Sequence, residues 1–397
     1  MEFDELIHPL DRSAFVARYW EKNCLHQKGS AGRFAGLVNW DGLNEFLENH
    51  RLLPDQLKLA REGSFIPPEK FFRTLPGAGN IPRIESGCLT ALLAAGASLL
   101  LENMAELSLP VRALSLSVCR ALKCRGGGAS LYASWHNIRG FGLHWHPDSV
   151  LALQLAGRKR WQIYPPTEPY AIAGEAPARP SGSPVLDITL EDGDLLYLPR
   201  GWWHVAHPLN GPSLHLSLSL SAATGVDFLH WAVDQLKQES LARQPLPLLD
   251  GDEAKAAHVG RLKDLLSQAL SGDALAEFGH NQAAPIRGRP PMRLLQAPYD
   301  QLGRLRDDTC IRLAAADVLR LELRGDKVQF QAYGKTYSVQ AFVAPALALL
   351  SEVEAISLAE LVAALGNANA AAELLQTLTT LAKAGVVLAE NPAGDGA

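Results

Sequence analysis

The segment from Leu131 to Leu220 most constrains the fold, because it is a succession of short β-like runs separated by turn signals. The runs are SVLALQLA, RKRWQIY, VLDITL, DLLYLP, WWHVAHP and SLHLSLSLS. Glycine or proline separates each run from the next, as in the Asp192-Gly193-Asp194 turn. Many short strands at this spacing are typical of an antiparallel sandwich or jelly roll. The middle of the chain is therefore predicted to be a β domain.

Helical periodicity dominates on both sides of this β region. The first ~120 residues read as short helices and loops, with capped helices expected after Asp11 and from Asn39. Two long helical segments are expected from Gly225 to about Gln282, and a Pro- and Arg-rich linker over 284–291. The last ~100 residues combine β-like segments with helices, as in a winged helix. We therefore predict an α+β chain with three parts, residues 1–224, 225–290 and 291–397.

The composition is that of an ordinary globular protein. The chain has 397 residues, of which 47% are hydrophobic and 20% charged, and its formal net charge is −5. This charge gives no reason to expect nucleic acid as a general partner. The five cysteines form no CxxC pair, which favours a reducing compartment. Since neither a signal peptide nor a membrane helix is evident, we expect a soluble cytoplasmic protein.

Histidines concentrate in the β region, where six of the twelve lie between His136 and His215. His144 and His146 occupy positions i and i+2 of GFGLHWHPDS, and on an extended chain such side chains share one face. His204 follows the turn, strand and Pro/Gly corner of EDGDLLYLPRGWWH. Three protein ligands with open positions are typical of mononuclear iron sites. The pattern predicts a metal site formed by His144, His146 and His204.

A lysine and a polar strand face suggest a pocket beside this metal site. In RKRWQIY, alternation places Lys159 on the same face as Trp161 and Ile163. A buried ammonium needs a partner, which an anionic small molecule would supply; a position at the rim or a protein carboxylate is an equal alternative. In SLHLSLSLS the leucines share one face and the serines share the other with His215, which makes His215 a candidate pocket residue.

The two stretches GFGLHWHPDSVLALQLAGRKRWQIYPP and EDGDLLYLPRGWWHVAHP resemble the JmjC-type, cupin-fold 2-oxoglutarate oxygenases. Within that class they resemble most the ribosomal oxygenases, which hydroxylate a side chain of a ribosomal protein. AFVARYWEKNCLHQKG looks like the family's opening helix and following strand. The resemblance implies a double-stranded β-helix (jelly roll), a helical dimerisation region after it, and a C-terminal winged-helix domain.

The resemblance also implies roles for individual residues. His144 and His204 would be the two histidines of an Fe(II) site. Lys159 would pair with the distal carboxylate of the cosubstrate 2-oxoglutarate, with assistance from Ser134. The implied reaction is that of a dioxygenase, in which oxidative decarboxylation of 2-oxoglutarate to succinate is coupled to hydroxylation of an unactivated C–H bond.

The chain departs from the family's His-x-Asp pattern at His146, which stands where the aspartate belongs. A neutral imidazole in place of a carboxylate leaves the site one charge unit more positive. Asp148 would serve instead if the chain bends at Pro147, but ligation by His146 is the favoured interpretation. Three-histidine iron sites occur in other cupin dioxygenases, so the departure is compatible with activity.

Three functions follow from these observations. The first is an Fe(II)/2-oxoglutarate hydroxylase acting on a protein, with a ribosomal protein as the implied substrate. The second is a three-histidine cupin enzyme that does not use 2-oxoglutarate, and the third is a catalytically silent dimeric interaction module. Lys159 favours the first, whereas His146 favours the others. A homodimer is expected from the apolar helical segment, and direct DNA binding is not, because AAELLQTLTTLAKAG carries a single lysine.

Overall fold

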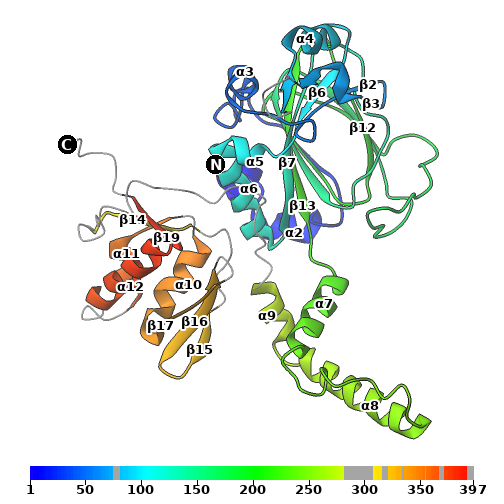
Figure 1. The fold of residues 1–397 in the computed structure, drawn as a ribbon. Helices are drawn as coiled ribbons and strands as arrows, with labels where there is room; N and C mark the ends of the chain where they lie inside the picture. The colour runs from blue at the N-terminus through cyan, green and yellow to red at the C-terminus, as the bar shows by residue number, and fades with distance from the viewer. Residues whose placement is uncertain are drawn as a thin grey trace. The chain divides into compact units, whose positions relative to one another are not determined.

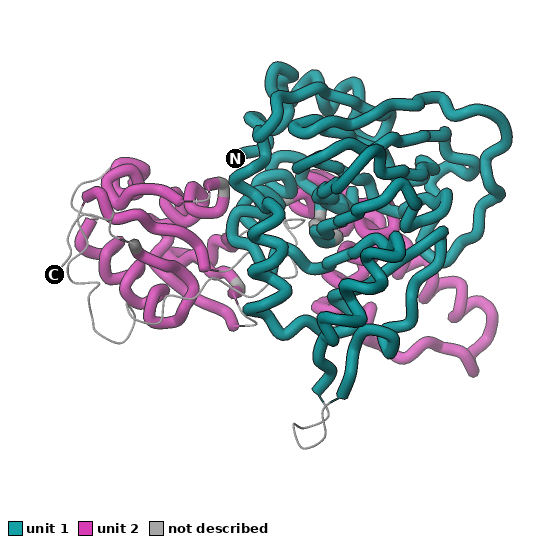
Figure 2. Tube along the Cα trace, turned by 90° about the horizontal axis from the view of Figure 1, so that it is seen from above, with its two compact units in different colours: residues 1–222, 285–289 teal, residues 223–284, 290–397 magenta. Residues whose placement is uncertain are grey.

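The computed structural model describes residues 1–74, 81–280, 307–314, 321–332, 335–353, 355–365 and 371–390. They fall into two compact units, which we call unit 1, ending at residue 222, and unit 2, beginning at residue 223 (Figure 2). The expected linker over 284–291 lies outside the described residues. None of the helices in the described ranges combines the length and hydrophobicity that a bilayer crossing requires. All five cysteines are free thiols.

Unit 1 is built around two β-sheets (Figure 1). The larger sheet has the strand order β1-β11-β8-β13-β7-β6-β2-β3, the smaller has the order β10-β9-β12, and β4 pairs with β5 in a separate two-stranded sheet. The strands are β1 (Leu25–Gln27), β2 (Leu57–Arg61), β3 (Ser64–Ile66), β4 (Phe72–Thr74), β5 (Pro82–Ile84), β6 (Ser98–Leu101), β7 (Arg125–Ser134), β8 (Ser149–Ala156), β9 (Lys159–Tyr164), β10 (Leu186–Leu190), β11 (Leu195–Leu198), β12 (Trp203–Pro208) and β13 (Ser213–Ser221).

All six β-like runs of the sequence form strands, β8 to β13, and their antiparallel pairing confirms the predicted sandwich. The prediction for the first ~120 residues was incomplete, because four strands from this region, β1, β2, β3 and β6, belong to the larger sheet, and only β1 was expected, from the family resemblance. Strand β6 is SLLL and is buried at every position. Such a short run, buried on both faces, has no polar alternation by which it could be recognised.

The helices of unit 1 are α1 (Phe3–Ile7), α2 (Arg12–Arg18), α3 (Trp40–Asn49), α4 (Ser86–Ala94), α5 (Met104–Leu107) and α6 (Leu109–Leu122). Both predicted caps are present. The side chain of Asp11 accepts a hydrogen bond from the amide of Ala14, and that of Asn39 accepts one from Gly42. These bonds satisfy amide groups that a helix start leaves unpaired.

Two apolar layers lie on opposite faces of the larger sheet. Leu151 and Leu153 of β8 belong to the core shared with the helices, whereas Val150 and Ala152 pack with Trp161 of the smaller sheet. Successive side chains of a strand point to opposite faces, so β8 is buried on both sides. The polar side chains of β13 face the second layer, between the two sheets, and this is where the candidate site lies.

Unit 2 begins with the helices α7 (Gly225–Leu236), α8 (Asp252–Ala269) and α9 (Ala274–His280). The second predicted helical segment is interrupted, because α8 ends before Ser271-Gly272 and α9 starts after it. Gly272 has a φ of +64°, the left-handed conformation with which helices commonly end. Phe228, Trp231 and Phe278 pack together between α7 and α9.

Within its described residues, the rest of unit 2 contains two three-stranded sheets, β18-β14-β19 and β15-β16-β17, and three α-helices. The elements are β14 (Cys310–Leu313), β15 (Glu322–Arg324), β16 (Lys327–Ala332), β17 (Lys335–Gln340), α10 (Ala344–Glu352), β18 (Ile356–Ser357), α11 (Leu358–Ala364), α12 (Ala371–Lys383) and β19 (Val387–Glu390). They enclose a core of their own, which includes Phe330, Leu347 and Leu378.

Candidate metal centre

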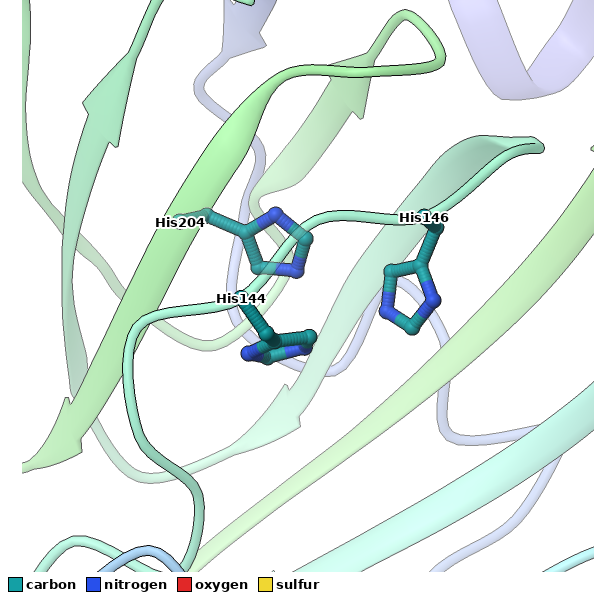
Figure 3. A group of neighbouring side chains, drawn as sticks. All are labelled: His144, His146 and His204. Carbon is teal, nitrogen blue, oxygen red and sulfur yellow. The ribbon is translucent and has the colours of Figure 1, made fainter. Parts of the chain in front are cut away.

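Three histidines, His144, His146 and His204, lie close together in unit 1 (Figure 3). His204 lies on β12, while His144 and His146 lie on the segment that precedes β8. The backbones of His144 and His204 form an isolated antiparallel bridge, with N–H to O=C distances of 3.1 Å and 2.8 Å. A third hydrogen bond runs from the amide of Gly201 to the carbonyl of His146 at 2.8 Å. Backbone pairing therefore fixes the two segments against each other.

The three side chains are close enough to share one ion. Their ligand atoms lie within 4.8 Å of one another, and the ring centroids are 4.4 Å apart for His144 and His204, 4.9 Å for His144 and His146, and 5.3 Å for His146 and His204. Among the described residues, this is the group of histidine, cysteine and carboxylate side chains that could hold a metal ion.

Two of the imidazole rings are oriented by backbone carbonyls. His144 Nδ1 lies 2.8 Å from the carbonyl oxygen of Gly142, and His204 Nδ1 lies 3.1 Å from that of Trp202. A ring that donates its Nδ1–H in this way presents Nε2 as the free lone pair, which is the usual arrangement behind a metal-binding histidine. In the described part of the chain, no backbone carbonyl accepts a hydrogen bond from the ring of His146 in this way.

The pocket favours neutral imidazoles. Burial lowers the pKa of His144, and burial together with the neighbouring His144 lowers the pKa of His146 to about 4. Burial, and then the two neighbouring histidines, hold the pKa of His204 well below its ordinary value. Since a metal binds the deprotonated ring, all three side chains are in their ligating form at neutral pH.

The sequence interpretation placed His144 and His146 on an extended chain, and the structure refines this. His144 and His146 lie between β7 and β8, and β8 begins only at Ser149. In this segment His144 forms a single isolated bridge. Asp148 does not belong to the histidine group, since its carboxylate accepts a hydrogen bond from Ser221 at the end of β13. The suggested replacement of His146 by Asp148 therefore finds no support in the geometry.

Lys159 lies on the inner face of β9, together with Trp161 and Ile163, as the alternation predicted. Its side chain is 5% exposed, and its Nζ lies 3.1 Å from His215 Nδ1. Burial lowers the pKa of Lys159 to about 7, and burial together with Lys159 holds the pKa of His215 well below its ordinary value. No carboxylate within the described ranges pairs with Lys159.

Ser134, the remaining candidate, is buried at the end of β7 and its hydroxyl lies 2.8 Å from that of Ser98 on β6. No hydrogen bond links Ser134 to Lys159 or His215 among the described residues. The structure thus places Lys159 next to His215, whereas the hydroxyl of Ser134 is hydrogen-bonded to Ser98.

Two aromatic residues of the site were not predicted as functional. Tyr132 stacks on His215, with ring centroids 4.6 Å apart, and burial, followed by Glu102, raises the pKa of Tyr132 to about 12. Trp161 lies 5.7 Å from the ring of His204 and 5.6 Å from that of His215. The alternation that identified Lys159 also places Trp161 on the same strand face, but alternation alone does not distinguish an aromatic residue of a pocket from one that only packs.

A carboxylate from the N-terminal part of the chain also connects to the histidine segments. Glu21 accepts a hydrogen bond from the hydroxyl of Ser149 at 2.6 Å and forms an ion pair with Arg200 at 2.9 Å. Ser149 lies three residues after His146, and Arg200 lies four residues before His204. Glu21 therefore ties together the two segments that carry the histidines.

Comparison with known proteins supports the resemblance seen in the sequence. Residues 112–228 match the family model described as the JmjC domain. Ribosomal oxygenase 1 of Bos taurus is 33% identical over 236 residues, which cover 57% of this chain and 34% of that protein. The bifunctional lysine-specific demethylase and histidyl-hydroxylase NO66 of Drosophila persimilis is 29% identical over 231 residues, which cover 54% and 31%. The chain thus spans about a third of the length of these curated relatives.

Solved structures extend the likeness to nearly the whole chain. YcfD, a ribosomal oxygenase from Escherichia coli in complex with cobalt and succinic acid, matches with a TM-score of 0.59 at 19% identity, covering 96% of this chain and 99% of that one. The same protein in complex with cobalt and 2-oxoglutarate matches with a TM-score of 0.58, the same identity and the same coverage. At this identity the likeness concerns the fold. Residues 112–228 thus match the JmjC domain, and the chain is similar to ribosomal oxygenases, in sequence over 57% of its length and in fold over 96%.

Proposed function

We propose that this chain is an Fe(II)- and 2-oxoglutarate-dependent oxygenase that hydroxylates a side chain of a protein, with a ribosomal protein as the substrate class. The observation that carries the proposal is the combination of three converging neutral imidazoles with a buried lysine that no described carboxylate neutralises. The names of the relatives support the same activity, since they describe ribosomal oxygenases and a histidyl-hydroxylase.

The donor set fits a divalent transition metal. Imidazole nitrogen is a ligand that iron, copper and zinc all accept, and three ligands on one side leave positions for other molecules. His144 and His204 come from paired backbone segments and are oriented by carbonyls, so they form the more rigid part of the site. His146 would complete the set as its third neutral donor.

The pocket also fits a dicarboxylic oxo acid. An isolated buried ammonium is costly, and a carboxylate beside it offsets that cost. Lys159 would hold the distal carboxylate of 2-oxoglutarate, with His215 orienting the ammonium from its other side. When bound, metal and cosubstrate would supply the reaction with dioxygen, which takes two electrons from 2-oxoglutarate, giving succinate and carbon dioxide, and two from the substrate C–H bond, giving the hydroxylated product.

The residues of this chain contribute orientation and a dry environment. The imidazoles provide a rigid half-shell of ligands, and Lys159 fixes one end of the cosubstrate. The layer formed by Val150, Ala152, Trp161 and Ile163 excludes water from the space between the sheets.

His146 favours a second candidate, a metal-binding protein that does not turn over 2-oxoglutarate. The deciding measurement is succinate formation from 2-oxoglutarate with added Fe(II), for the wild type and for His146→Asp. Succinate from the wild type is the result we expect. Turnover by His146→Asp alone would favour a silent interaction module, and absence of both turnover and 2-oxoglutarate binding in the two proteins would exclude the proposed enzyme.

We further propose that the chain forms a homodimer through α7 to α9 and that its C-terminal part is a winged-helix-like domain. Val226, Leu229 and Val233 form an exposed apolar stripe on α7 at helical spacing. The three helices and two small sheets of residues 307–390 are compatible with a winged helix. A cytoplasmic location and a role of this domain in protein contacts, rather than DNA binding, remain predictions.

A further inference from the structure

A buried tryptophan beside the candidate site has an unused hydrogen-bond donor. Trp161 is 3% exposed, and its indole Nε1 is buried without a hydrogen-bond partner among the described residues. Trp203, on the neighbouring strand β12, is also buried, but its Nε1 donates to the hydroxyl of Thr167 at 3.1 Å. Buried donors are rarely left unpaired, because the group loses its bond to water without replacement.

The position of Trp161 relates this donor to the chemistry of the site. Its ring is 5.7 Å from that of His204, a candidate metal ligand, and 5.6 Å from that of His215, which contacts Lys159. On β9 it is two residues from Lys159, on the same face of the strand. Trp161 is therefore a neighbour of both the metal centre and the lysine.

The Lys159 ammonium and the Trp161 indole N–H are both hydrogen-bond donors that a carboxylate oxygen could accept from. The ammonium group of Lys159 pairs with no carboxylate among the described residues. The indole N–H of Trp161 has no acceptor among them either. A carboxylate-bearing molecule between the histidines and Lys159 would satisfy both donors, whereas an apolar molecule would satisfy neither. Packing alone does not require the nitrogen, since phenylalanine would provide an aromatic ring at the same place.

We infer that the indole N–H of Trp161 donates a hydrogen bond to a carboxylate oxygen of the oxo acid that bridges Lys159 and the metal centre. Trp161 is thereby a specificity-determining residue for the cosubstrate, in addition to Lys159. This inference rests on the proposed function, because it assumes that the pocket takes a dicarboxylic oxo acid.

The test is 2-oxoglutarate binding by the full-length protein without turnover. Calorimetry under argon, with Mn(II) bound, gives the dissociation constant of 2-oxoglutarate for wild type, Trp161→Phe, Trp203→Phe and Lys159→Met. Titration of Mn(II) alone gives the metal affinity of each protein and shows whether the pocket is intact. Trp203→Phe is the matched control, since it removes an indole N–H whose acceptor is already provided by the protein.

We expect Trp161→Phe to weaken 2-oxoglutarate binding about tenfold or more while its Mn(II) affinity stays within about twofold of wild type. Trp203→Phe should change neither value by more than that. If Lys159→Met abolishes binding while Trp161→Phe binds like wild type, the role of Trp161 is refuted and the proposed function stands. If the wild type itself binds no 2-oxoglutarate, the proposed function fails and the role of Trp161 falls with it.

Discussion

Lys159 is the residue whose surroundings imply the clearest dependence on pH. Burial lowers its pKa to about 7 in the ligand-free protein, and a bound carboxylate favours the charged form. Below pH 7 the ammonium is already present, whereas above pH 7 binding must be accompanied by uptake of a proton. We therefore expect the affinity for 2-oxoglutarate to be constant below pH 7 and to fall about tenfold per pH unit above it.

The measurement is calorimetry with Mn(II) between pH 6 and pH 9, in buffers of different ionisation enthalpy to count the protons taken up. Lys159→Arg is the control, since a guanidinium stays protonated over this range and should remove the slope. An affinity of the wild type that does not vary with pH, with no proton uptake, would refute this account of Lys159.

Glu21 allows a second prediction about single residues. Glu21→Gln keeps the side-chain shape but loses the ion pair with Arg200, which precedes the segment bearing His204. We expect metal affinity to fall about three- to tenfold, because losing one partner of a partly buried ion pair costs about 1–3 kcal/mol, between the exposed and the fully buried limits, and only part of it acts on the histidines. Co(II) titration followed by its visible absorption measures this.

The matched control for Glu21 is Asp187→Asn, which breaks the exposed pair of Asp187 with Arg160 on the solvent face of β9 and β10. Exposed pairs of this kind contribute little, so its Co(II) affinity should equal that of wild type. Equal affinities for Glu21→Gln and Asp187→Asn would show that Glu21 does not position the site.

At the scale of elements, the turn between β8 and β9 holds Lys159 in register. Gly157 has a φ of +70°, and a Cβ atom there would lie 2.0 Å from the carbonyl oxygen of Pro212. Gly157→Ala is therefore expected to destabilise unit 1 by about 2–4 kcal/mol, through backbone strain and the collision. Gly174 has a similar φ, +93°, but a Cβ atom there would meet nothing within 4 Å. Gly174→Ala should therefore lower the free energy of unfolding by only about 1 kcal/mol. Urea unfolding measures both; equal losses would contradict the role of the close approach.

Strands were predictable where one face is polar or where turn residues bound them. The alternation in KRWQIY and SLHLSLSLS identified β9 and β13 and the inward position of Lys159. The alternation could not reveal β6, which is buried throughout, nor the pairing of β2 with β6 and of β6 with β7, because strand order is set by contacts between distant segments. The histidines were found from spacing, but the ion pair of Glu21 with Arg200 spans 179 positions and leaves no local signal.

At the scale of the whole molecule, the exposed stripe on α7 is the feature that predicts self-association. Leu229 lies at its centre and is 46% exposed. If a second copy covers this stripe, Leu229→Glu buries an unpaired charge at the interface and should convert a dimer into a monomer. Light scattering coupled to size exclusion measures the mass, and Leu323→Glu, at an exposed leucine on β15, should leave it unchanged. A wild type that is monomeric at all concentrations would contradict the proposed dimer.

The central claim concerns the metal and its three histidines. The most direct test is the crystal structure of protein purified without air, with anomalous scattering recorded on both sides of the iron absorption edge. We expect one iron ion per chain, bound by a ring nitrogen of His144, His146 and His204, with its remaining positions free of protein ligands. An ion bound by Asp148 in place of His146, or no ion within reach of the three rings, would contradict the account.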